Sequence, residues 1–272
     1  MTQPQLSIQL YTVNDQLVAD PDGTLARLAE MGLTQVEAYA FVDRAESLAE
    51  AFERHALHAR TGHAHLLSDE LRFGDRVIPV FAHDEIFAAA KTLGMEYVID
   101  PMVGLDRWLD ADQISATAAR LNAAAETAAG HGLRVGYHNH AQEFAATIDG
   151  RSGYEFFVDQ LRDDVVLELD VFWAATAKVD VTALLGRLGD RVKALHVKDG
   201  YVGVNPFTPD AAPFDKAELD QRSAGQGELP MLDYLAAAPG CEFAVIEFDH
   251  FAGDMFDGVQ GSVDFFHANG IK

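Results

Sequence analysis

The sequence predicts an α/β protein that folds as a single (β/α)8 TIM barrel over residues 1–272. Short apolar runs alternate with segments whose apolar residues recur at helical spacing, a pattern typical of a parallel sheet covered by helices. Glycine stands at three helix-to-strand junctions, at positions Gly32, Gly94 and Gly132, where it favours the end of a helix. Several of the apolar runs end in a residue type that can bind a metal or transfer a proton. This is expected where the strands of a barrel converge on an active site.

The elements are expected in strict alternation along the chain. The expected strands are Leu6–Tyr11, Gln35–Tyr39, Leu57–Gly62, Tyr97–Pro101, Arg134–His138, Val166–Asp170, Ala194–Lys198 and Phe243–Glu247. The expected helices are Thr24–Met31, Ser47–His55, Ala82–Leu93, Ile114–Gly130, Tyr154–Leu161, Val181–Leu188, Met231–Ala238 and Val259–Ala268. A doubly wound open sheet is the alternative fold, but no glycine-rich dinucleotide fingerprint follows the first strand.

One long stretch, Gly200–Leu229, has no regular pattern and is rich in Pro, Gly and Asp. It is too long for an ordinary connection, so it predicts a loop over the mouth of the active site. No linker or low-complexity tract divides the chain, and we therefore expect one domain.

Composition excludes several classes of function. The formal net charge of -23 opposes binding to nucleic acids or to anionic membranes. The single cysteine, Cys241, rules out an internal disulfide framework and suits a reducing compartment. No run approaches the roughly 18 apolar residues that span a bilayer, and the first residues lack a signal core. These features predict a cytoplasmic protein without nucleic-acid or membrane partners.

Polar residues gather at the ends of the expected strands, where a barrel places its active site. His63 and His65 alternate with Ala64 and therefore project to the same side. Each candidate also has a structural interpretation, as a helix cap, a hydrogen-bonded core residue or a solvated ion pair. The candidates are Gln9, Tyr11, Glu37, His63, His65, Asp100, His138, His140, Glu143, Asp170, His196, Lys198, Glu247 and Asp249.

Several phrases resemble the xylose-isomerase-like sugar isomerase/epimerase superfamily along essentially the whole chain. They are Ser7-Ile-Gln-Leu-Tyr-Thr-Val13, Gly136-Tyr-His-Asn-His-Ala-Gln-Glu-Phe144, Glu168-Leu-Asp-Val-Phe-Trp173, Leu195-His-Val-Lys-Asp199 and Val245-Ile-Glu-Phe-Asp249. The resemblance implies a (β/α)8 barrel that binds a divalent metal through Glu, Asp, His and Glu on the fifth to eighth strands.

Carried onto this sequence, the implied ligands are Glu143, Asp170, His196 and Glu247. The fifth strand has Tyr137-His138 where a glutamate is typical, so His138 is the alternative first ligand. In this respect the chain looks more like the branch that includes inosose dehydratases and enzymes acting on oxidised sugars.

Three carboxylates and one imidazole favour Mn²⁺ first, with Mg²⁺, Co²⁺ or Zn²⁺ as alternatives. Such a metal polarises a sugar carbonyl and stabilises the enediolate formed when the neighbouring carbon loses a proton. The hypothesis assigns metal binding and acid/base duty to Glu143 and Glu247, and proton movement to His138 or His140. Side chains expected to contact the substrate are Gln9, Tyr11, Glu37, His63, His65 and Lys198.

The expected function is a metal-dependent sugar isomerase or epimerase acting on a small carbohydrate. A dehydratase or lyase acting on an inosose or 3-keto-glycoside could use the same site, and a non-catalytic sugar-binding barrel is the alternative of another class. The abasic-DNA endonuclease branch of the superfamily is disfavoured by 20 Lys+Arg against 43 Asp+Glu. The sequence leaves open whether the chain forms a homo-oligomer.

Overall fold

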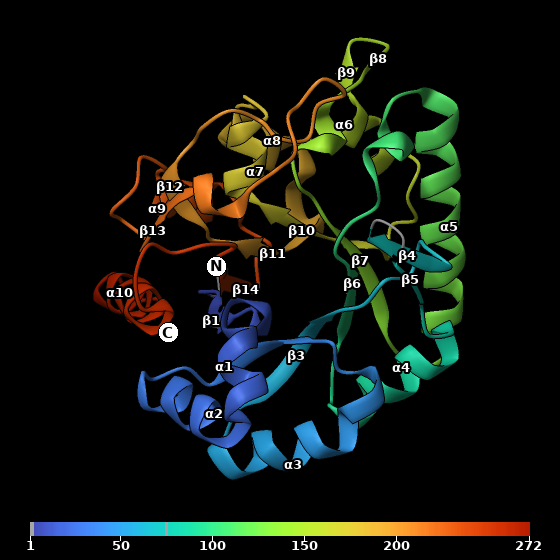
Figure 1. Ribbon diagram of the computed structural model, residues 1–272. Helices are drawn as coiled ribbons and strands as arrows, with labels where there is room; N and C mark the ends of the chain where they lie inside the picture. The colour runs from blue at the N-terminus through green and yellow to red at the C-terminus, as the bar shows by residue number, and fades with distance from the viewer. Residues whose placement is uncertain (1–2, 74–75) are drawn as a thin grey trace.

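Eight parallel strands form the centre of the computed structural model, which describes residues 3–73 and 76–272 (Figure 1). They follow one another around the sheet in the order β1-β14-β11-β10-β7-β6-β3-β2. A parallel bridge between Gln9 and Glu37 joins the two ends of the sheet, so the predicted barrel is confirmed. The strands are β1 (Gln5–Ile8), β2 (Gln35–Tyr39), β3 (His58–His63), β6 (Tyr97–Asp100), β7 (Arg134–His138), β10 (Val166–Asp170), β11 (Val192–His196) and β14 (Phe243–Ile246).

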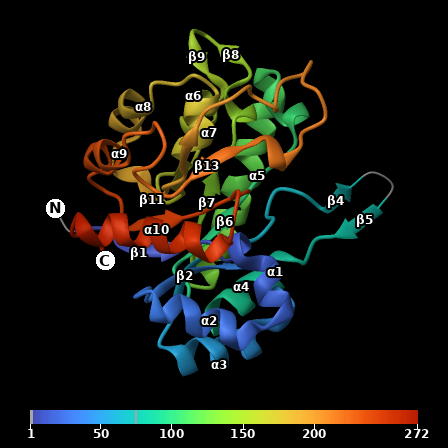
Figure 2. The same ribbon diagram turned by 60° about the vertical axis from the view of Figure 1, so that its left-hand side comes forward.

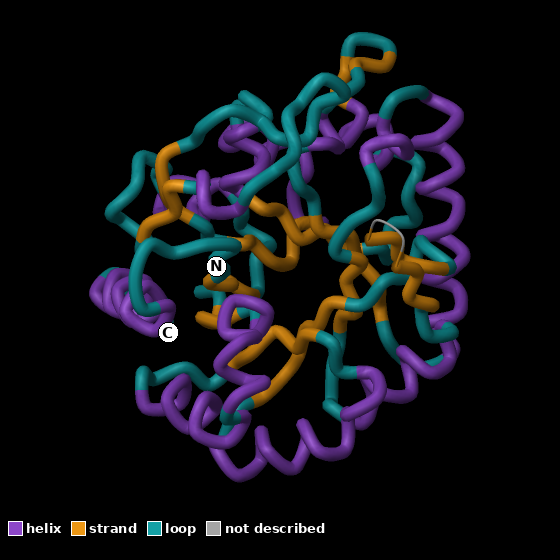
Figure 3. The backbone as a smooth tube through the Cα atoms, in the orientation of Figure 1, coloured by secondary structure: helices purple, strands orange, loops and turns teal. Residues whose placement is uncertain are grey.

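Helices surround the strands on the outside, as the tube view shows (Figure 3). Those in expected places are α2 (Pro21–Glu30), α3 (Ala45–His55), α4 (His83–Thr92), α5 (Ala111–Gly130), α6 (Gly153–Val158), α8 (Val181–Leu188), α9 (Met231–Ala237) and α10 (Met255–Ala268). Gly32, Gly94 and Gly132 adopt φ angles of 94°, 74° and 73°, the left-handed conformation expected after a helix. Across the described residues, no helix is both long and apolar enough to cross a membrane.

Two helices and several short turns were not expected. Helix α1 (Asn14–Ala19) precedes α2, and α7 (Val171–Thr176) follows β10 without a loop. The Asp170 side chain makes this junction possible, because it accepts a hydrogen bond from Trp173 N at 2.8 Å and so caps α7. The 3-10 turns are Leu10–Val13, Val42–Arg44, Leu105–Trp108, Gln142–Phe144, Gly189–Arg191 and Lys216–Glu218.

Three two-stranded hairpins also lie outside the predicted pattern. Strands β4 (Glu70–Phe73) and β5 (Arg76–Pro79) form one that extends away from the barrel (Figure 2). Strands β8 (Thr147–Ile148) and β9 (Arg151–Ser152) form the second, and β12 (Asp199–Tyr201) and β13 (Asp220–Arg222) form the third. The third hairpin lies within the stretch that the sequence predicts as irregular.

The interior of the barrel is apolar in its lower part and polar above. Its buried apolar cluster consists of Tyr97, Ile99, Val166, Ala194, Phe243 and Val245. Side chains two residues apart on a strand point to the same side, so the next inward residues are Glu168, His196 and Glu247. All three are buried, and the polar layers therefore rest directly on an apolar floor.

The long connection after β11 is held at its base by one carboxylate. Asp199 is buried, and its oxygens accept backbone hydrogen bonds from Gly200, Gly225, Gly227 and Leu229 at 2.7, 2.8, 3.1 and 3.2 Å. These bonds bring the two ends of the connection together, so the intervening residues form a closed loop.

We predict that Asp199→Asn destabilises this loop, because an amide nitrogen cannot accept the backbone N–H groups that one carboxylate oxygen now accepts. The expected loss is about 1–3 kcal/mol in the free energy of unfolding, with faster proteolytic cleavage between residues 202 and 219. Urea denaturation and limited proteolysis measure both effects.

The matched control is Asp220→Asn, which alters a surface pair with Arg222 and is expected to change stability by less than about 0.5 kcal/mol. Equal behaviour of the two variants would contradict the anchoring role.

Candidate active site

A layer of buried histidines and glutamates lies directly above the apolar floor. Glu37 on β2 and Glu168 on β10 each direct one oxygen at His63 on β3 and His196 on β11. His63 Nε2 lies 2.7 Å from Glu168 Oε1 and 3.1 Å from Glu37 Oε1. His196 Nε2 lies 2.8 Å from Glu37 Oε1 and 3.0 Å from Glu168 Oε1. The two imidazoles stack nearly parallel, with ring centroids 5.4 Å apart.

The charges of this lower layer compensate one another. Burial alone lowers the pKa of His63, but the carboxylates of Glu37 and Glu168 outweigh it and raise the value to about 10. The same balance raises the pKa of His196 above its ordinary range, through Glu168 and Glu247. Burial and the charge of Glu37 raise the pKa of Glu168, but the imidazoles lower it to about 2. The layer is therefore a set of imidazolium–carboxylate pairs.

A second polar layer lies at the mouth of the barrel, around the Lys198 ammonium group. Lys198 Nζ lies 3.0 Å from Asp170 Oδ2, 2.8 Å from Glu247 Oε2 and 2.9 Å from Asp249 Oδ2. Burial lowers the pKa of Lys198, but the three carboxylates raise it above its ordinary value, so the amine stays charged. Three carboxylates thus share one ammonium group, and negative charge is in excess.

Four side chains of the mouth could hold a metal ion. One atom each from His138, Asp170, His196 and Glu247 lies within 4.8 Å of the others, and all four residues are buried. The structure therefore brings together Asp170, His196 and Glu247, which lie far apart in the sequence. Two imidazoles and two carboxylates suit a divalent transition metal, and the excess negative charge favours its binding. The donor set thus fits the implied metal.

Glu143, the sequence-based first ligand, lies outside this group. Its Oε1 accepts a hydrogen bond from the Tyr137 hydroxyl at 2.8 Å, and its Oε2 accepts one from His140 N at 2.9 Å. The 3-10 turn Gln142–Phe144 directs the carboxylate back under the chain, where burial raises its pKa to about 8. Neither potential ligand group found among the described residues contains Glu143, whereas both contain His138, the alternative ligand.

Aromatic residues of the long loop cover the mouth. The Phe207 ring packs against His140 and Trp173, with centroids 5.6 and 5.1 Å away. On the opposite side, the Lys216 ammonium group lies 4.5 Å from the centre of the Tyr11 ring and donates a hydrogen bond to its hydroxyl. The loop therefore extends from the exit of β1 to the exits of β7 and β10, as the sequence predicts.

His140 lies beside His138 at the mouth, with ring centroids 5.1 Å apart. Its Nδ1 is buried and has no hydrogen-bond partner among residues 3–73 and 76–272. Burial lowers the pKa of His140 to about 4, with the Lys198 ammonium adding to the effect, so the imidazole is neutral near pH 7. A neutral imidazole carries one N–H and one lone pair, so it can donate or accept a hydrogen bond.

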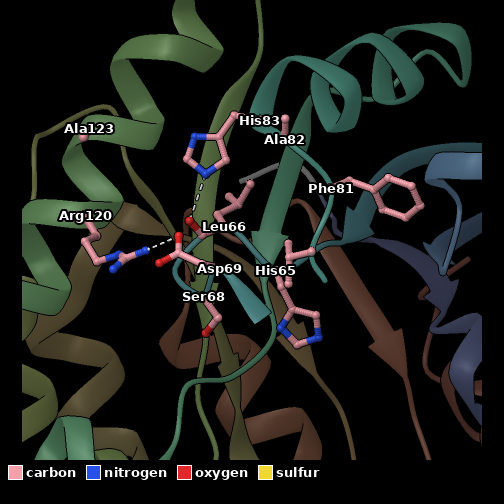
Figure 4. Close-up of a pocket in the computed structure, with 10 residues that line it drawn as sticks. His65, Leu66, Ser68, Asp69, Phe81, Ala82, His83, Arg120 and Ala123 are labelled. Carbon is pink, nitrogen blue, oxygen red and sulfur yellow. Dashed lines mark hydrogen bonds and ion pairs between the residues drawn. The ribbon is translucent and has the colours of Figure 1, made fainter. Parts of the chain in front are cut away.

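The remaining predicted contact residues divide between two places. Gln9 is buried and donates a hydrogen bond to Glu37 Oε1 at 2.8 Å, so it supports the lower layer. His65 instead lines a cavity of about 480 Å³ beside the β4–β5 hairpin (Figure 4). The same wall carries the Arg120–Asp69 pair, at 2.8 Å, and His83, whose Nε2 lies 2.9 Å from Leu66 O. This cavity includes none of the four potential ligands.

Sequence reasoning missed Glu168 as a site residue. It lies inside the apolar run Val166–Asp170, where the pattern indicates a buried strand and does not single out its carboxylate. The available signal was the two-residue spacing from Asp170, which places both carboxylates on the inner face of the barrel. Gln221 of β13 was also missed, and it ties the loop to the mouth by donating to Asp249 Oδ2 at 3.0 Å.

A parallel barrel with a potential metal site at the C-terminal ends of its strands defines a class of α/β enzymes. Residues 25–238 match the family model of the xylose isomerase-like TIM barrel, and the chain belongs to this family. No protein with a curated description matches the sequence.

Solved structures with the same fold cover nearly the whole chain. A sugar phosphate isomerase/epimerase from Parabacteroides distasonis is 20% identical, with a TM-score of 0.73 over 98% of this chain and 97% of that one. The probable 3-DHS dehydratase AsbF from Bacillus anthracis, involved in petrobactin synthesis, is 12% identical, with a TM-score of 0.71 over 97% and 98%. The IolI protein with a bound zinc atom is 17% identical, with a TM-score of 0.69 over 96% and 95%.

We predict that Asp170→Asn removes the bound metal, whereas Glu143→Gln does not. Asp170→Asn removes a charged ligand and is expected to abolish stoichiometric metal binding. Glu143→Gln places an amide nitrogen against either the Tyr137 hydroxyl or the His140 N–H. It is therefore expected to cost about 1–3 kcal/mol of stability but to leave metal content unchanged.

Elemental analysis of both purified variants, with thermal unfolding alongside, measures the two effects. Loss of metal from Glu143→Gln, with retention by Asp170→Asn, would restore Glu143 as a ligand and contradict the assignment of His138.

Proposed function

We propose that the protein is a metal-dependent sugar isomerase or epimerase that removes a proton from the carbon next to a carbonyl group. The observation that carries the proposal is the convergence of His138, Asp170, His196 and Glu247 at the barrel mouth, beside Lys198 and a neutral His140. Membership of the xylose isomerase-like family and the likeness to a sugar phosphate isomerase/epimerase support a carbohydrate substrate.

In this proposal the divalent ion is held by His138, Asp170, His196 and Glu247. When bound, it polarises the substrate carbonyl as a Lewis acid. The sequence favours Mn²⁺ first, but a second imidazole in place of a carboxylate moves the preference towards Zn²⁺ or Co²⁺. The zinc atom of the IolI protein is consistent with this set of ions.

His140 is proposed to move the proton, replacing Glu143 in that role. Its buried Nδ1 has no hydrogen-bond partner among the described residues, and its imidazole is neutral at pH 7. It lies against Phe207 of the loop, which excludes water from one side of the ring. Lys198 is proposed to donate a hydrogen bond to the substrate oxygen on which negative charge develops.

The same first step supports a dehydratase or lyase, in which a group leaves from the neighbouring carbon after the proton is removed. The likeness to a probable 3-DHS dehydratase favours this second candidate to about the same degree as the likeness to an isomerase favours the first. Inososes and 3-keto-glycosides are the proposed substrate classes, since both carry a carbonyl next to a carbon that bears hydrogen.

We predict that metal-loaded protein exchanges substrate hydrogen with solvent deuterium. Chelator-treated protein reloaded with Mn²⁺, Co²⁺ or Zn²⁺ is incubated in D2O with ketoses, inososes and 3-keto-glycosides, and the products are examined by NMR. Deuterium is expected at the carbon next to the carbonyl, and only when metal is present.

Glu247→Gln should abolish both metal content and exchange. If this variant keeps full metal content and full exchange, the proposed site is wrong. Absence of exchange on all substrates, with no stoichiometric metal, would instead indicate a non-catalytic sugar-binding barrel.

We predict that His140→Gln slows deuterium exchange about 10²–10⁴-fold, the usual contribution of a positioned acid or base. Metal content should be unchanged, because His140 belongs to neither potential ligand group. The control is His131→Gln at the end of α5, whose surface imidazole pairs with Asp84. Equal exchange by both variants would remove His140 from the reaction.

A further inference from the structure

We propose that Glu168 is a positioning residue that fixes the tautomers of His138 and His196, so that each imidazole presents a lone pair to the cation at the mouth. The inference rests on the metal site of the proposed function and adds a residue that does not itself bind the ion. It concerns the chain's own hydrogen bonds and can be tested by metal affinity without any substrate.

The two nitrogens of each imidazole face different layers. His138 Nδ1 lies 3.1 Å from Glu168 Oε1, while its Nε2 lies 3.9 Å from Asp170 Oδ2. His196 Nε2 lies 3.0 Å from Glu168 Oε1, while its Nδ1 lies 2.7 Å from Glu247 Oε2. The ring centroids are 4.4 Å apart. One oxygen of Glu168 thus contacts the inner nitrogen of both histidines.

The chemistry of these groups assigns the protons. A neutral imidazole carries one N–H and one lone pair, and an ionised carboxylate can only accept hydrogen bonds. The nitrogens that face Glu168 therefore carry hydrogens. His196 Nδ1 also carries one here, because it lies 2.7 Å from Glu247 Oε2. A cation at the mouth would displace that hydrogen, and the lone pairs would then lie on His138 Nε2 and His196 Nδ1. Those two atoms face the mouth carboxylates Asp170 and Glu247. A carboxylate behind a ligating histidine fixes the ring orientation and raises the basicity of the ligand.

Glu168 is better placed for this role than its neighbour Glu37. Glu37 Oε1 contacts His196 and His63 and accepts a hydrogen bond from Gln9, but it is not among the contacts of His138. Glu168 Oε1 contacts His63, His138 and His196 together. Among the described residues, Glu168 is therefore the carboxylate that lies within 3.1 Å of a nitrogen of both proposed imidazole ligands.

A second cation in the lower layer is the competing explanation, since His63, His138, Glu168 and His196 also offer atoms within 4.8 Å of one another. Their nitrogen-to-oxygen distances to Glu168 are 2.7, 3.1 and 3.0 Å, which are hydrogen-bond lengths. A tetrahedral site with bonds of about 2.0–2.1 Å would separate its ligand atoms by roughly 3.3–3.4 Å. The lower layer is therefore hydrogen-bonded in this structure, as is the contact of His196 Nδ1 with Glu247 Oε2 at 2.7 Å. The number of zinc equivalents bound decides between one ion and two.

The test is a zinc titration of the full-length protein in competition with a chromophoric chelator. The wild type is compared with Glu168→Gln, which has the same shape but no charge, so that its carbonyl oxygen accepts the imidazole N–H groups more weakly. The control is Glu143→Gln, which alters an equally buried carboxylate that contacts neither ligand. Glu168→Gln is expected to raise the Kd for zinc about 10–100-fold. Glu143→Gln should bind zinc as the wild type does.

A measurement on the wild type keeps the test valid if Glu168→Gln fails to fold. In the zinc-loaded protein, ¹⁵N NMR of the imidazoles should find hydrogens on His138 Nδ1 and His196 Nε2. The opposite tautomers would overturn the proposal.

The titration distinguishes failure of the proposed metal site from failure of the proposed role of Glu168. A wild type that binds no zinc contradicts the metal site of the proposed function itself. One equivalent bound equally well by the wild type and by Glu168→Gln overturns the role of Glu168 alone. Two equivalents bound by the wild type overturn it as well, because the inner nitrogens would then be ligands rather than hydrogen-bond donors.

Discussion

The His196 imidazole connects the two charged layers inside the barrel, and the arrangement of both layers depends on it. One ring nitrogen contacts Glu247 at the mouth, and the other contacts Glu37 and Glu168 below. Isolated buried charges are strongly unfavourable, so each layer must be compensated within the barrel. Because His196 pairs with both, a change in the protonation of its outer nitrogen alters the charge balance of the lower layer too.

This constraint links the proposed metal to the histidines. With no cation, burial is offset by the surrounding carboxylates, and the pKa values of His63 and His196 are raised. A divalent ion at the mouth would take over part of that compensation and displace the proton on the outer nitrogen of His196. The lower layer would keep its hydrogen bonds, since they use the inner nitrogen. A cation at the mouth could therefore replace the proton on the outer nitrogen of His196 while the strands stay in place.

The sequence predicted the fold well because each strand signal was local and repeated. Runs such as Val166–Asp170 have the strong apolar character of buried strands, and glycines mark the helix ends. The meeting of Asp170, His196 and Glu247 was expected from barrel topology together with the resemblance to the family. The position of Glu143 could not be predicted, because a short turn directs its side chain towards Tyr137 and the backbone of His140. The hairpins were missed because their strands of two to four residues carry too little periodicity to recognise.

A histidine at the end of the fifth strand also changes the charge of the proposed ligand set. Glutamate, aspartate, histidine and glutamate together carry three negative charges, whereas His138, Asp170, His196 and Glu247 carry two when the imidazoles are neutral. Two carboxylates balance a divalent ion without excess. Lys198 then pairs with Asp249, and the charges of these two groups cancel. A substrate oxygen that gains negative charge would therefore enter a more positive environment than three carboxylate ligands allow, which favours reactions that pass through an enediolate.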